Sequence, residues 1–593
     1  MGAPLPKTRA AALRLPAKPV ILKIDGIEVT QAIQNMAHSV PLIAGKATVA
    51  RVYLTLKFNF PLPPGQPSAS VTGEVSVRRT PAGPVTKLVA ANAIPVPQQG
   101  SLKDRRKSLD LSLNFLIPDH LVTVGDLYLR VSRLEIKIAG FPKSLVIPVP
   151  SHTTRHVTLV TSPPLRVRIV GIRYTTGTPP QSYAPSARDF QMVLSWLRRA
   201  YPVPEVLATQ AIIDATSTWP FFCGDVNAQL SAIRALDVAG GMDRRTHYYG
   251  LVADGADFMR GCASGIPQTP DPTTVASGPV GSATFGWDND GCYGDWYTGH
   301  ELGHTFGRFH PGFCGETHDD SSYPFANGQL SNSDGDFVGF DFGDAALGLP
   351  MQALPGVDWH DVMTYCTFQW LSSYTYMGVR NRIVAEETLG AAPGPVRGAA
   401  RVRRRAATAS TDLIQAVARV NTQDGSGRFV FVNPIPAGDP TPQDPKSPVL
   451  LRALDASGKV LAQYRIAPKH DTCQEGGPGG SATIDAIFPK TGSLAVLELT
   501  VSGKTVDTFR PTTARLSTRS VRSGTPPKDL RYTVQTSIDG GATWQTQAVG
   551  AKSRKYKLNP EEFGAAKTVK VRIIASNGFE SSVVSTENRK VQN

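Results

Sequence analysis

The eleven residues from His300 to His310 read H-E-x-x-H-x-x-G-x-x-H and constrain the chain more than any other segment. His300 and His304 are four residues apart. On a helix their rings therefore lie on one face, one turn apart, where neutral nitrogens can bind one Zn²⁺. Glu301 lies about 100° further round the helix, where it can act on a water as general base without binding the metal. Gly307 is predicted to end the helix in the left-handed conformation, which lets His310 turn inward as the third ligand. Three protein ligands leave a fourth position open for water, which is typical of a catalytic zinc.

The neighbouring residues support a helix at this position. Asp295 is a candidate N-cap, and Leu302 and Phe306 form a candidate apolar face opposite the metal. The alternative is an amphipathic helix with ordinary surface histidines. The chain has 11 His and 54 Gly in 593 residues. At that composition the five fixed letters should coincide on the order of 10⁻⁵ times per chain, so we favour the metal site.

A second motif, W-H-D-V-M-T-Y-C, lies downstream at 359–366. Together the two motifs resemble the metzincins, the zinc peptidases whose long zinc motif is followed by a methionine turn. The resemblance implies that Met363 forms a hydrophobic floor beneath the zinc ligands. Tyr365 matches the tyrosine that astacins and serralysins place near the metal, which implies a fourth protein ligand or a donor to the oxyanion. The alternative for Tyr365 is a core tyrosine beside the turn.

The resemblance covers roughly residues 165–390 and indicates no single metzincin family. Metzincins bind substrate as an added strand along an edge strand above the zinc helix. Val280–Trp287, a short run rich in small residues, is the candidate for that edge strand, and a plain sheet strand is the alternative. The segment from Gly312 to Asp358 is longer than a minimal link between the two motifs needs.

The length of 593 residues predicts several domains. We expect an α+β multidomain fold, with a metzincin-like α/β catalytic domain flanked by all-β sandwich domains. Alternating runs at Ile27–Gln31 and Thr48–Leu56 indicate an Ig-like sandwich near the N-terminus. The expected order is a flexible N-terminus at 1–18, the Ig-like sandwich at 19–160, the zinc peptidase domain at 163–392, a basic linker at 393–410, a second sandwich at 411–515 and an Ig- or fibronectin-III-like module at 516–593.

Strands and helices alternate within the range 163–392. Ser186 is expected to cap a helix that runs to Tyr201 and stops before Pro202. The other expected elements are strands at Leu165–Tyr174 and Tyr248–Ala253, and helices at Asp225–Leu236 and Ser373–Glu387.

The six cysteines form no C-x-x-C pair, which argues against a cysteine zinc site and favours disulfides in an oxidising compartment. Cys314 follows the third ligand by four residues, and Cys366 follows Met363 by three. If both segments line one site, a Cys314–Cys366 bridge would join its two halves. As an alternative to a disulfide, Cys292 is a candidate for an inhibitory thiolate that binds the zinc.

The formal net charge is +14. Solvated arginines of the linker, such as Arg403–Arg405, account for part of it, and an affinity for acidic partners such as glycans is the alternative. No nucleic-acid motif accompanies the charge. No apolar run is long enough for a transmembrane helix, and the basic first twenty residues lack the apolar core of a signal peptide.

Two further motifs are weaker. The acidic stretch from Ser333 to Asp344 is a candidate Ca²⁺ site, although its spacing is not that of an EF-hand and a solvated loop is the alternative. Ser537–Trp544 matches an Asp-box, S-x-D-x-G-x-T-W, and is expected to form a stable β-hairpin with a packed tryptophan.

These observations predict a secreted, modular zinc endopeptidase that acts on protein or glycoprotein substrates. One alternative is a catalytically silent extracellular adhesion or glycan-binding protein with a zinc-bound domain, against which the intact Glu301 argues. The other is a zinc hydrolase of a non-peptide bond. The oligomeric state cannot be read from the sequence.

Overall fold

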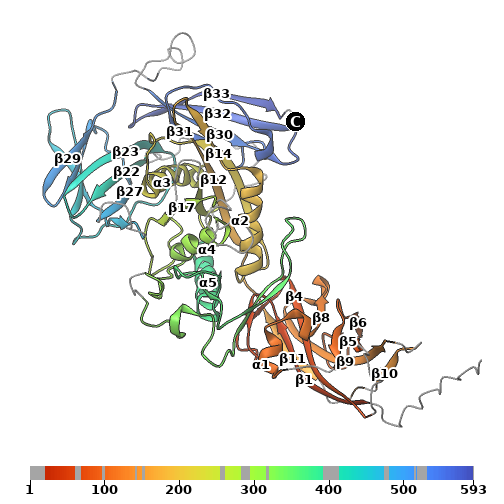
Figure 1. Cartoon of the computed structure of the whole chain (residues 1–593). Coiled ribbons are helices and arrows are strands. Elements are labelled where there is room, and N and C mark those ends of the chain that lie inside the picture. The colour runs from red at the N-terminus through yellow and green to blue at the C-terminus, as the bar shows by residue number, and fades with distance from the viewer. Residues whose placement is uncertain are drawn as a thin grey trace, which may run out of the picture. The chain divides into compact units, whose positions relative to one another are not determined.

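The computed structural model describes residues 20–59, 69–96, 100–139, 143–147, 149, 154–253, 261–281, 294–315, 320–390, 413–472, 480–512, 516 and 530–591. The fold is mostly β-sheet, with several separate sheets and a few helices, as expected for a chain of several domains (Figure 1). Two compact units can be distinguished. Unit 1 comprises Met1–Thr161 and Gln329–Trp359, and unit 2 comprises Ser162–Gly328 and His360–Asn593.

Two of the sheets of unit 1 share one hydrophobic core. Alternation along β5 (Ala69–Arg78) buries every second side chain, as a strand with one face on a core requires. The first sheet has the order β1 (Val20–Thr30), β4 (Thr48–Phe58) and β8 (Leu113–Ile117). The second has the order β3 (Leu42–Ile43), β11 (Thr154–Val160), β9 (Gly125–Ile138), β5 and β6 (Thr86–Val89), with β10 (Leu145–Ile147) on β9 and β7 (Ile94–Val96) on β5.

Residues 329–359 belong to unit 1, although the sequence analysis placed them in the 163–392 domain. The reason is strand pairing over a long sequence distance. Strand β18 (Val338–Asp341) pairs antiparallel with β19 (Gln352–Pro355) and also with β2 (Ile33–Gln34) near the N-terminus. The Leu330 N–H donates to the Trp359 carbonyl over 3.0 Å. This hydrogen bond joins the two ends of the segment 329–359, which we call the excursion.

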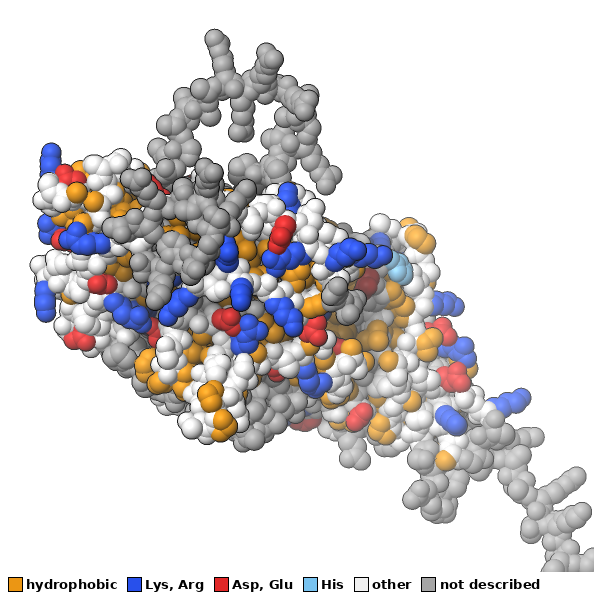
Figure 2. All heavy atoms as spheres, turned by 90° about the horizontal axis from the view of Figure 1, so that it is seen from above, with side chains coloured by type: hydrophobic (Ala, Val, Ile, Leu, Met, Phe, Trp, Pro, Cys, Tyr) orange, Lys and Arg blue, Asp and Glu red, His pale blue; other side chains and the backbone are white. Residues whose placement is uncertain are grey.

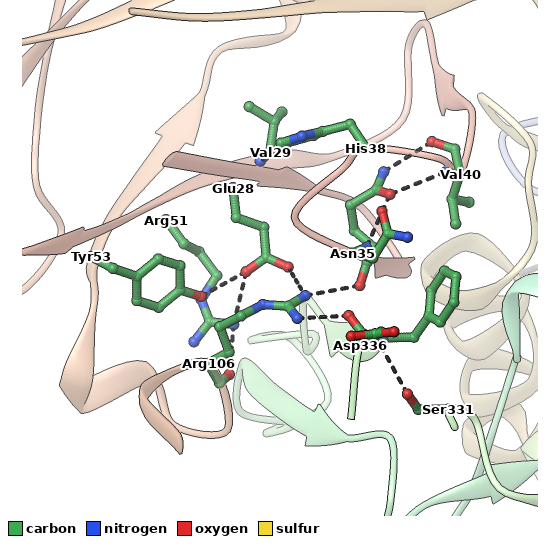
Figure 3. Close-up of polar contacts among 12 residues, drawn as sticks. Glu28, Val29, Asn35, His38, Val40, Arg51, Tyr53, Arg106, Ser331 and Asp336 are labelled. Atoms are coloured by element: carbon green, nitrogen blue, oxygen red, sulfur yellow. Dashed lines mark hydrogen bonds and ion pairs between the residues drawn. The ribbon is translucent and has the colours of Figure 1, made fainter. Parts of the chain in front are cut away.

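A buried group of charges joins the excursion to the first strands (Figure 3). Arg106, at the end of α1 (Leu102–Arg106), forms an ion pair with Glu28 and donates to the Asp336 carbonyl over 2.7 Å. The Tyr53 hydroxyl donates to Glu28 over 2.6 Å, and Arg51 lies 3.7 Å from the same carboxylate. Burial raises the pKa of Glu28, but the positive charges of Arg106 and Arg51 outweigh it and hold that pKa below its usual value.

Replacing Arg106 by methionine should destabilise unit 1, because one partner of a buried ion pair is removed and the Glu28 charge stays buried. The free energy of unfolding is expected to fall by about 3 kcal/mol. Urea denaturation with hydrogen exchange on β4 and β9 measures it. Lys107→Met removes a neighbouring, partly exposed cation and should change stability by less than about 0.5 kcal/mol. Equal losses in the two variants would contradict the role of the buried pair.

The first part of unit 2 is a sheet with the parallel strand order β14 (Val206–Asp214), β12 (Leu165–Thr176), β15 (His247–Val252) and β17 (Ala276–Pro279). The short β16 (Cys262–Ala263) pairs antiparallel with β17, and β13 (Gln181–Tyr183) with the end of β12. The strands expected at 165–174 and 248–253 are confirmed as β12 and β15.

The expected helices are confirmed with small shifts at their ends. Helix α2 (Ala187–Ala200) begins after Ser186, whose side chain forms a capping box with Asp189. Helix α3 (Cys223–Ala239) begins two residues earlier than expected and reaches Gly240, and α5 covers Ser373–Glu386. Figure 1 shows α3 between the sheet of β14, β12, β15 and β17, which we call the central sheet, and the strands that follow residue 413.

Two β-modules complete unit 2. The module at 413–512 consists of two four-stranded sheets around one core, as expected for a sandwich. Their orders are β23 (Ser426–Ile435), β22 (Leu413–Asn421), β27 (Ser481–Pro489), β26 (Lys469–His470), and β25 (Val460–Arg465), β24 (Val449–Leu454), β28 (Val496–Val501), β29 (Lys504–Phe509). The expected basic linker lies outside the described residues.

The last module, expected to be Ig- or fibronectin-III-like, is an all-β module in its described residues. In its described residues it is one antiparallel sheet with the order β31 (Gln545–Ala551), β30 (Arg531–Ser537), β32 (Thr568–Ser576) and β33 (Ser581–Lys590). Strand β31 packs on α3 instead of on a second sheet of its own. The Asp-box forms the expected turn: Asp539 accepts from the Thr543 hydroxyl over 2.7 Å, and Trp544 is buried.

The surface of the described residues carries dispersed charge. On the face drawn in Figure 2, lysine and arginine side chains are spread among apolar and uncharged ones. No helix in the described part of the chain is long and apolar enough to cross a membrane.

Candidate metal centre

The motif lies on helix α4 (Gly294–Thr305), all of whose residues are buried. Asp295 is inside the first turn of this helix and is therefore not its N-cap, contrary to expectation. Gly294, which precedes it in the helix, lies against the backbone of Val280, where a Cβ atom would be 1.9 Å from the carbonyl oxygen. The Asp295 carboxylate lies 3.8 Å from the Arg199 guanidinium, also buried.

The three histidines converge as the spacing predicts. Nε2 of His300 lies 3.2 Å from Nε2 of His310, and one nitrogen from each of His300, His304 and His310 lies within 4.8 Å of the others. No other group of three or more metal-binding side chains occurs among the described residues. The structure therefore contains a histidine cluster that could hold a metal ion.

Backbone carbonyls orient two of the rings. Nδ1 of His300 lies 2.7 Å from the Val362 carbonyl, and Nδ1 of His304 lies 2.8 Å from the Arg308 carbonyl. A carbonyl can only accept, so both Nδ1 atoms carry the proton, and the Nε2 lone pairs point into the cluster. Nε2 of His304 is buried and has no hydrogen-bond partner among the residues that the structure describes. A cation held by the three nitrogens would satisfy this atom, so the donor set fits a metal.

Burial keeps the cluster neutral. It lowers the pKa of His300 to about 4, although the Val362 carbonyl opposes the shift. Burial, together with the nearby His300 ring, lowers the pKa of His310 to about 3. Neutral imidazoles are the form that binds metals, so the rings are ready to bind near pH 7.

Gly307 ends the helix as predicted. Its φ is +77°, and its N–H donates to the His304 carbonyl over 2.8 Å. A Cβ atom there would lie 2.5 Å from the guanidinium of Arg382, which itself donates to the Pro267 carbonyl over 2.8 Å. The left-handed turn and the adjacent guanidinium together require glycine where the chain turns back towards His310.

Met363 lies directly beneath α4. It is 1% exposed, and a Cβ atom on Gly303 would be 2.5 Å from its sulfur. The buried Asp361 shapes this turn by accepting the N–H groups of Met363 and Ser372, each over 2.9 Å. It thereby holds the Val362 carbonyl against His300. Sequence reasoning missed this role of Asp361; the short spacing Asp-x-Met, typical of an Asx-turn, was the available signal.

The other two candidate residues also lie at the cluster. Glu301 is fully buried on α4, next to His300 in the chain. The Tyr365 ring is half-buried, with its centroid 5.3 Å from that of His310 and 5.9 Å from that of His300. The fold therefore brings Tyr365 to the histidines from a segment 55 residues beyond His310 (365 − 310).

The Cys314–Cys366 disulfide is confirmed and links the segment after His310 to the segment after Met363. A second disulfide, Cys223–Cys262, links the start of α3 to β16. Cys292 and Cys473 lie outside the described residues.

The side of α4 away from the metal cluster is densely packed. Leu302 and Phe306 are buried there, as expected. His247, which the sequence did not single out, lies beside the last residue of the helix: its two ring nitrogens lie 3.0 Å from Thr305 Oγ1 and 3.0 Å from Glu386 Oε2. It thus connects β15, α4 and α5, and no local pattern marks it.

Several candidate segments do not reach the cluster. The carboxylates of the acidic stretch 333–344 do not converge, because they bond to their own loop: Asp341 accepts from Gly343, and Asp344 from Ala346. Among the described residues these carboxylates form no converging group, which favours the alternative of a solvated loop over the candidate Ca²⁺ site. Of the candidate edge strand Val280–Trp287, only residues 280 and 281 are described; they follow β17 and belong to no strand.

In comparisons with known proteins, no family model, curated protein or solved structure matches this chain.

Changing Asp361 to alanine should weaken metal binding without removing a ligand, because the Val362 carbonyl loses its support against His300. Loss of such an outer partner typically lowers metal affinity by about 10–100-fold. Competition with a chromophoric Zn²⁺ chelator measures the change. Asp358→Ala, at an exposed carboxylate three residues earlier, is the matched control and should leave the affinity unchanged. An unaltered affinity in Asp361→Ala would show that the turn does not position the ring.

Proposed function

We propose that this chain is a zinc-dependent, metzincin-like endopeptidase. The observation that carries the proposal is the set of three buried, neutral imidazoles whose nitrogens converge beside the buried Glu301 and above Met363. A structural metal would not require a buried carboxylate beside the ligands, whereas hydrolysis requires a base at that place.

The donor set supports zinc as the metal. Three imidazole nitrogens, with no cysteine among them, are the ligand number of catalytic rather than structural zinc sites. His300, His304 and His310 would hold the ion, and the carbonyls of Val362 and Arg308 would keep the rings oriented. Zn²⁺ at such a site polarises a carbonyl and makes water nucleophilic near neutral pH.

Glu301 is the proposed general base. Its carboxylate takes the proton of the attacking water and later transfers it to the nitrogen of the leaving amine, so that the peptide bond breaks without a free charged amide anion. Because Glu301 is fully buried, it acts where little water competes for its proton. Its fixed helical position next to His300 supports this role.

Tyr365 is the proposed oxyanion donor. Its hydroxyl would donate to the carbonyl oxygen as negative charge develops there, and its ring position beside His300 and His310 supports this. The alternative, a phenolate ligand in the resting enzyme, needs the same position.

The proposed substrates are proteins or glycoproteins outside the cell. The two disulfides, Cys314–Cys366 and Cys223–Cys262, support folding in an oxidising compartment.

Glu301→Gln should retain one zinc per chain and lose turnover by about 10²–10⁴-fold, because an amide cannot accept the proton. Metal analysis and cleavage of peptide and protein libraries, read by mass spectrometry, test this on both forms. Glu205→Gln, at an exposed carboxylate of unit 2, should cleave like the wild type. Full activity in zinc-loaded Glu301→Gln would refute the base, and zinc in both forms without cleavage by the wild type would favour the adhesion alternative.

Tyr365→Phe removes only the hydroxyl. If this group donates to the oxyanion, kcat should fall by about 10²–10³-fold while KM stays nearly constant, because the bond forms only as charge develops. Steady-state kinetics on one cleaved peptide separate the two constants. Tyr323→Phe, at a buried tyrosine whose ring packs edge-on to Tyr374, controls for loss of a buried hydroxyl. An unchanged kcat in Tyr365→Phe would make Tyr365 a packing residue.

A further inference from the structure

A groove of ≈ 810 Å³ lies between the central sheet of unit 2 and its last β-module. Its volume is that of a ligand-binding cleft. One wall is the end of β14, and the other is β31 with the segment 552–562. Strand β14 pairs only with β12, and β31 pairs only with β30, so in the described sheets both walls are open strand edges.

At the edge of β14, a backbone N–H group donates to a side chain instead of to a neighbouring strand. The Ile212 N–H donates over 3.0 Å to Oε1 of Glu562. The other carboxylate oxygen of Glu562, Oε2, is buried, with no hydrogen-bond partner in the described part of the chain. The Glu562 carboxylate therefore takes the place of the carbonyl of a neighbouring strand, and a peptide that adds to β14 would replace it at the Ile212 N–H.

The floor and the rim of the groove differ in character. The half-buried Ile212, Ala548 and Leu558 line it and give an apolar floor, beneath which the fully buried Ile213, Val534 and Val549 lie. Three exposed lysines, Lys552, Lys555 and Lys557, also line it, and none of them forms an ion pair among the described residues.

The other charges of the groove are already engaged. Arg173 is paired with Asp214 over 2.6 Å, and Glu562 with the Ile212 amide. The rim therefore presents a net positive charge to whatever binds.

We propose that this groove binds an acidic peptide segment of a partner protein in extended conformation. The main chain of the segment would add to the edge of β14, its apolar side chains would face the floor, and its carboxylates would face the three lysines. The open strand edges favour a peptide over an anionic glycan, because a glycan has no regular row of amide and carbonyl groups. The site is independent of the histidine cluster and of its proposed chemistry.

Fluorescence anisotropy tests the site with a labelled decapeptide of alternating glutamate and valine on the full-length protein. The triple variant Lys552→Glu, Lys555→Glu, Lys557→Glu should bind at least about tenfold more weakly. The matched control is Lys446→Glu, Lys459→Glu, Lys504→Glu, at exposed lysines of the 413–512 module, and it should bind within about twofold of the wild type. Equal weakening in the two triple variants would mean a non-specific effect of net charge and would overturn the site.

A second probe separates strand addition from charge attraction alone. The same decapeptide with alternate amides N-methylated keeps every carboxylate but cannot pair along one edge. It should bind at least about tenfold more weakly to the wild type, because several main-chain hydrogen bonds are lost. Equal binding of the two peptides, or displacement of the first by a sulfated polysaccharide with no effect of N-methylation, would show a polyanion surface and overturn the peptide proposal. Circular dichroism confirms that the variants, all altered at exposed residues, remain folded.

Discussion

The arrangement of unit 2 depends on the close approach of α4 to the turn that carries Met363. Gly303 brings the helix backbone against the Met363 sulfur, and the Val362 carbonyl of the same turn receives Nδ1–H of His300. On the opposite side, a Cβ atom on Gly299 would be 2.1 Å from the ring of Trp196. Glycine inside a helix costs roughly 1 kcal/mol each relative to alanine. That cost is offset because larger residues would push the helix away from both neighbours and open the histidine cluster.

The parts of the site formed by residues close together in sequence could be predicted, whereas the contacts between residues far apart in sequence could not. The helical spacing of His300 and His304, the glycine that ends the helix and the cysteines near each motif are read within a few residues. The contact of His247 with Glu386 joins residues 139 positions apart and has no local pattern. For Asp361 only the Asx-turn to Met363 has a local signal, whereas its contact with Ser372 has none. The N-cap prediction for Asp295 was wrong because Asp295 lies inside α4, where its buried carboxylate is 3.8 Å from the Arg199 guanidinium.

The length of the segment between the two motifs is explained by its strand pairing within unit 1, which its sequence does not predict. Pairing of β18 with β2 depends on two-residue contacts between strands roughly 300 positions apart, for which strand propensity provides no signal. The excursion 329–359 is nevertheless well anchored in unit 1, because Arg106 binds both Glu28 and the Asp336 carbonyl. Within unit 2, the Cys314–Cys366 disulfide joins the segments that precede and follow this excursion. The two ends of the segment between the motifs are thus covalently held together.

The last β-module is part of the fold of unit 2, although the sequence analysis expected it to be a separate domain. The fully buried Arg168 of β12 lies 3.2 Å from Asp237 of α3 and donates over 2.7 Å to the Thr546 carbonyl of β31. Asp237 also accepts the Thr546 N–H and the Tyr248 hydroxyl. Burial raises the pKa of Asp237, and Arg168 and these hydrogen bonds oppose that shift. Without β31 the buried ion pair would lose two backbone partners, so the sheet must dock at this point. The sheet docks through α3 and β12, and β14 and β31 do not pair with each other. Two strand edges are therefore left without a strand partner on either side of the groove.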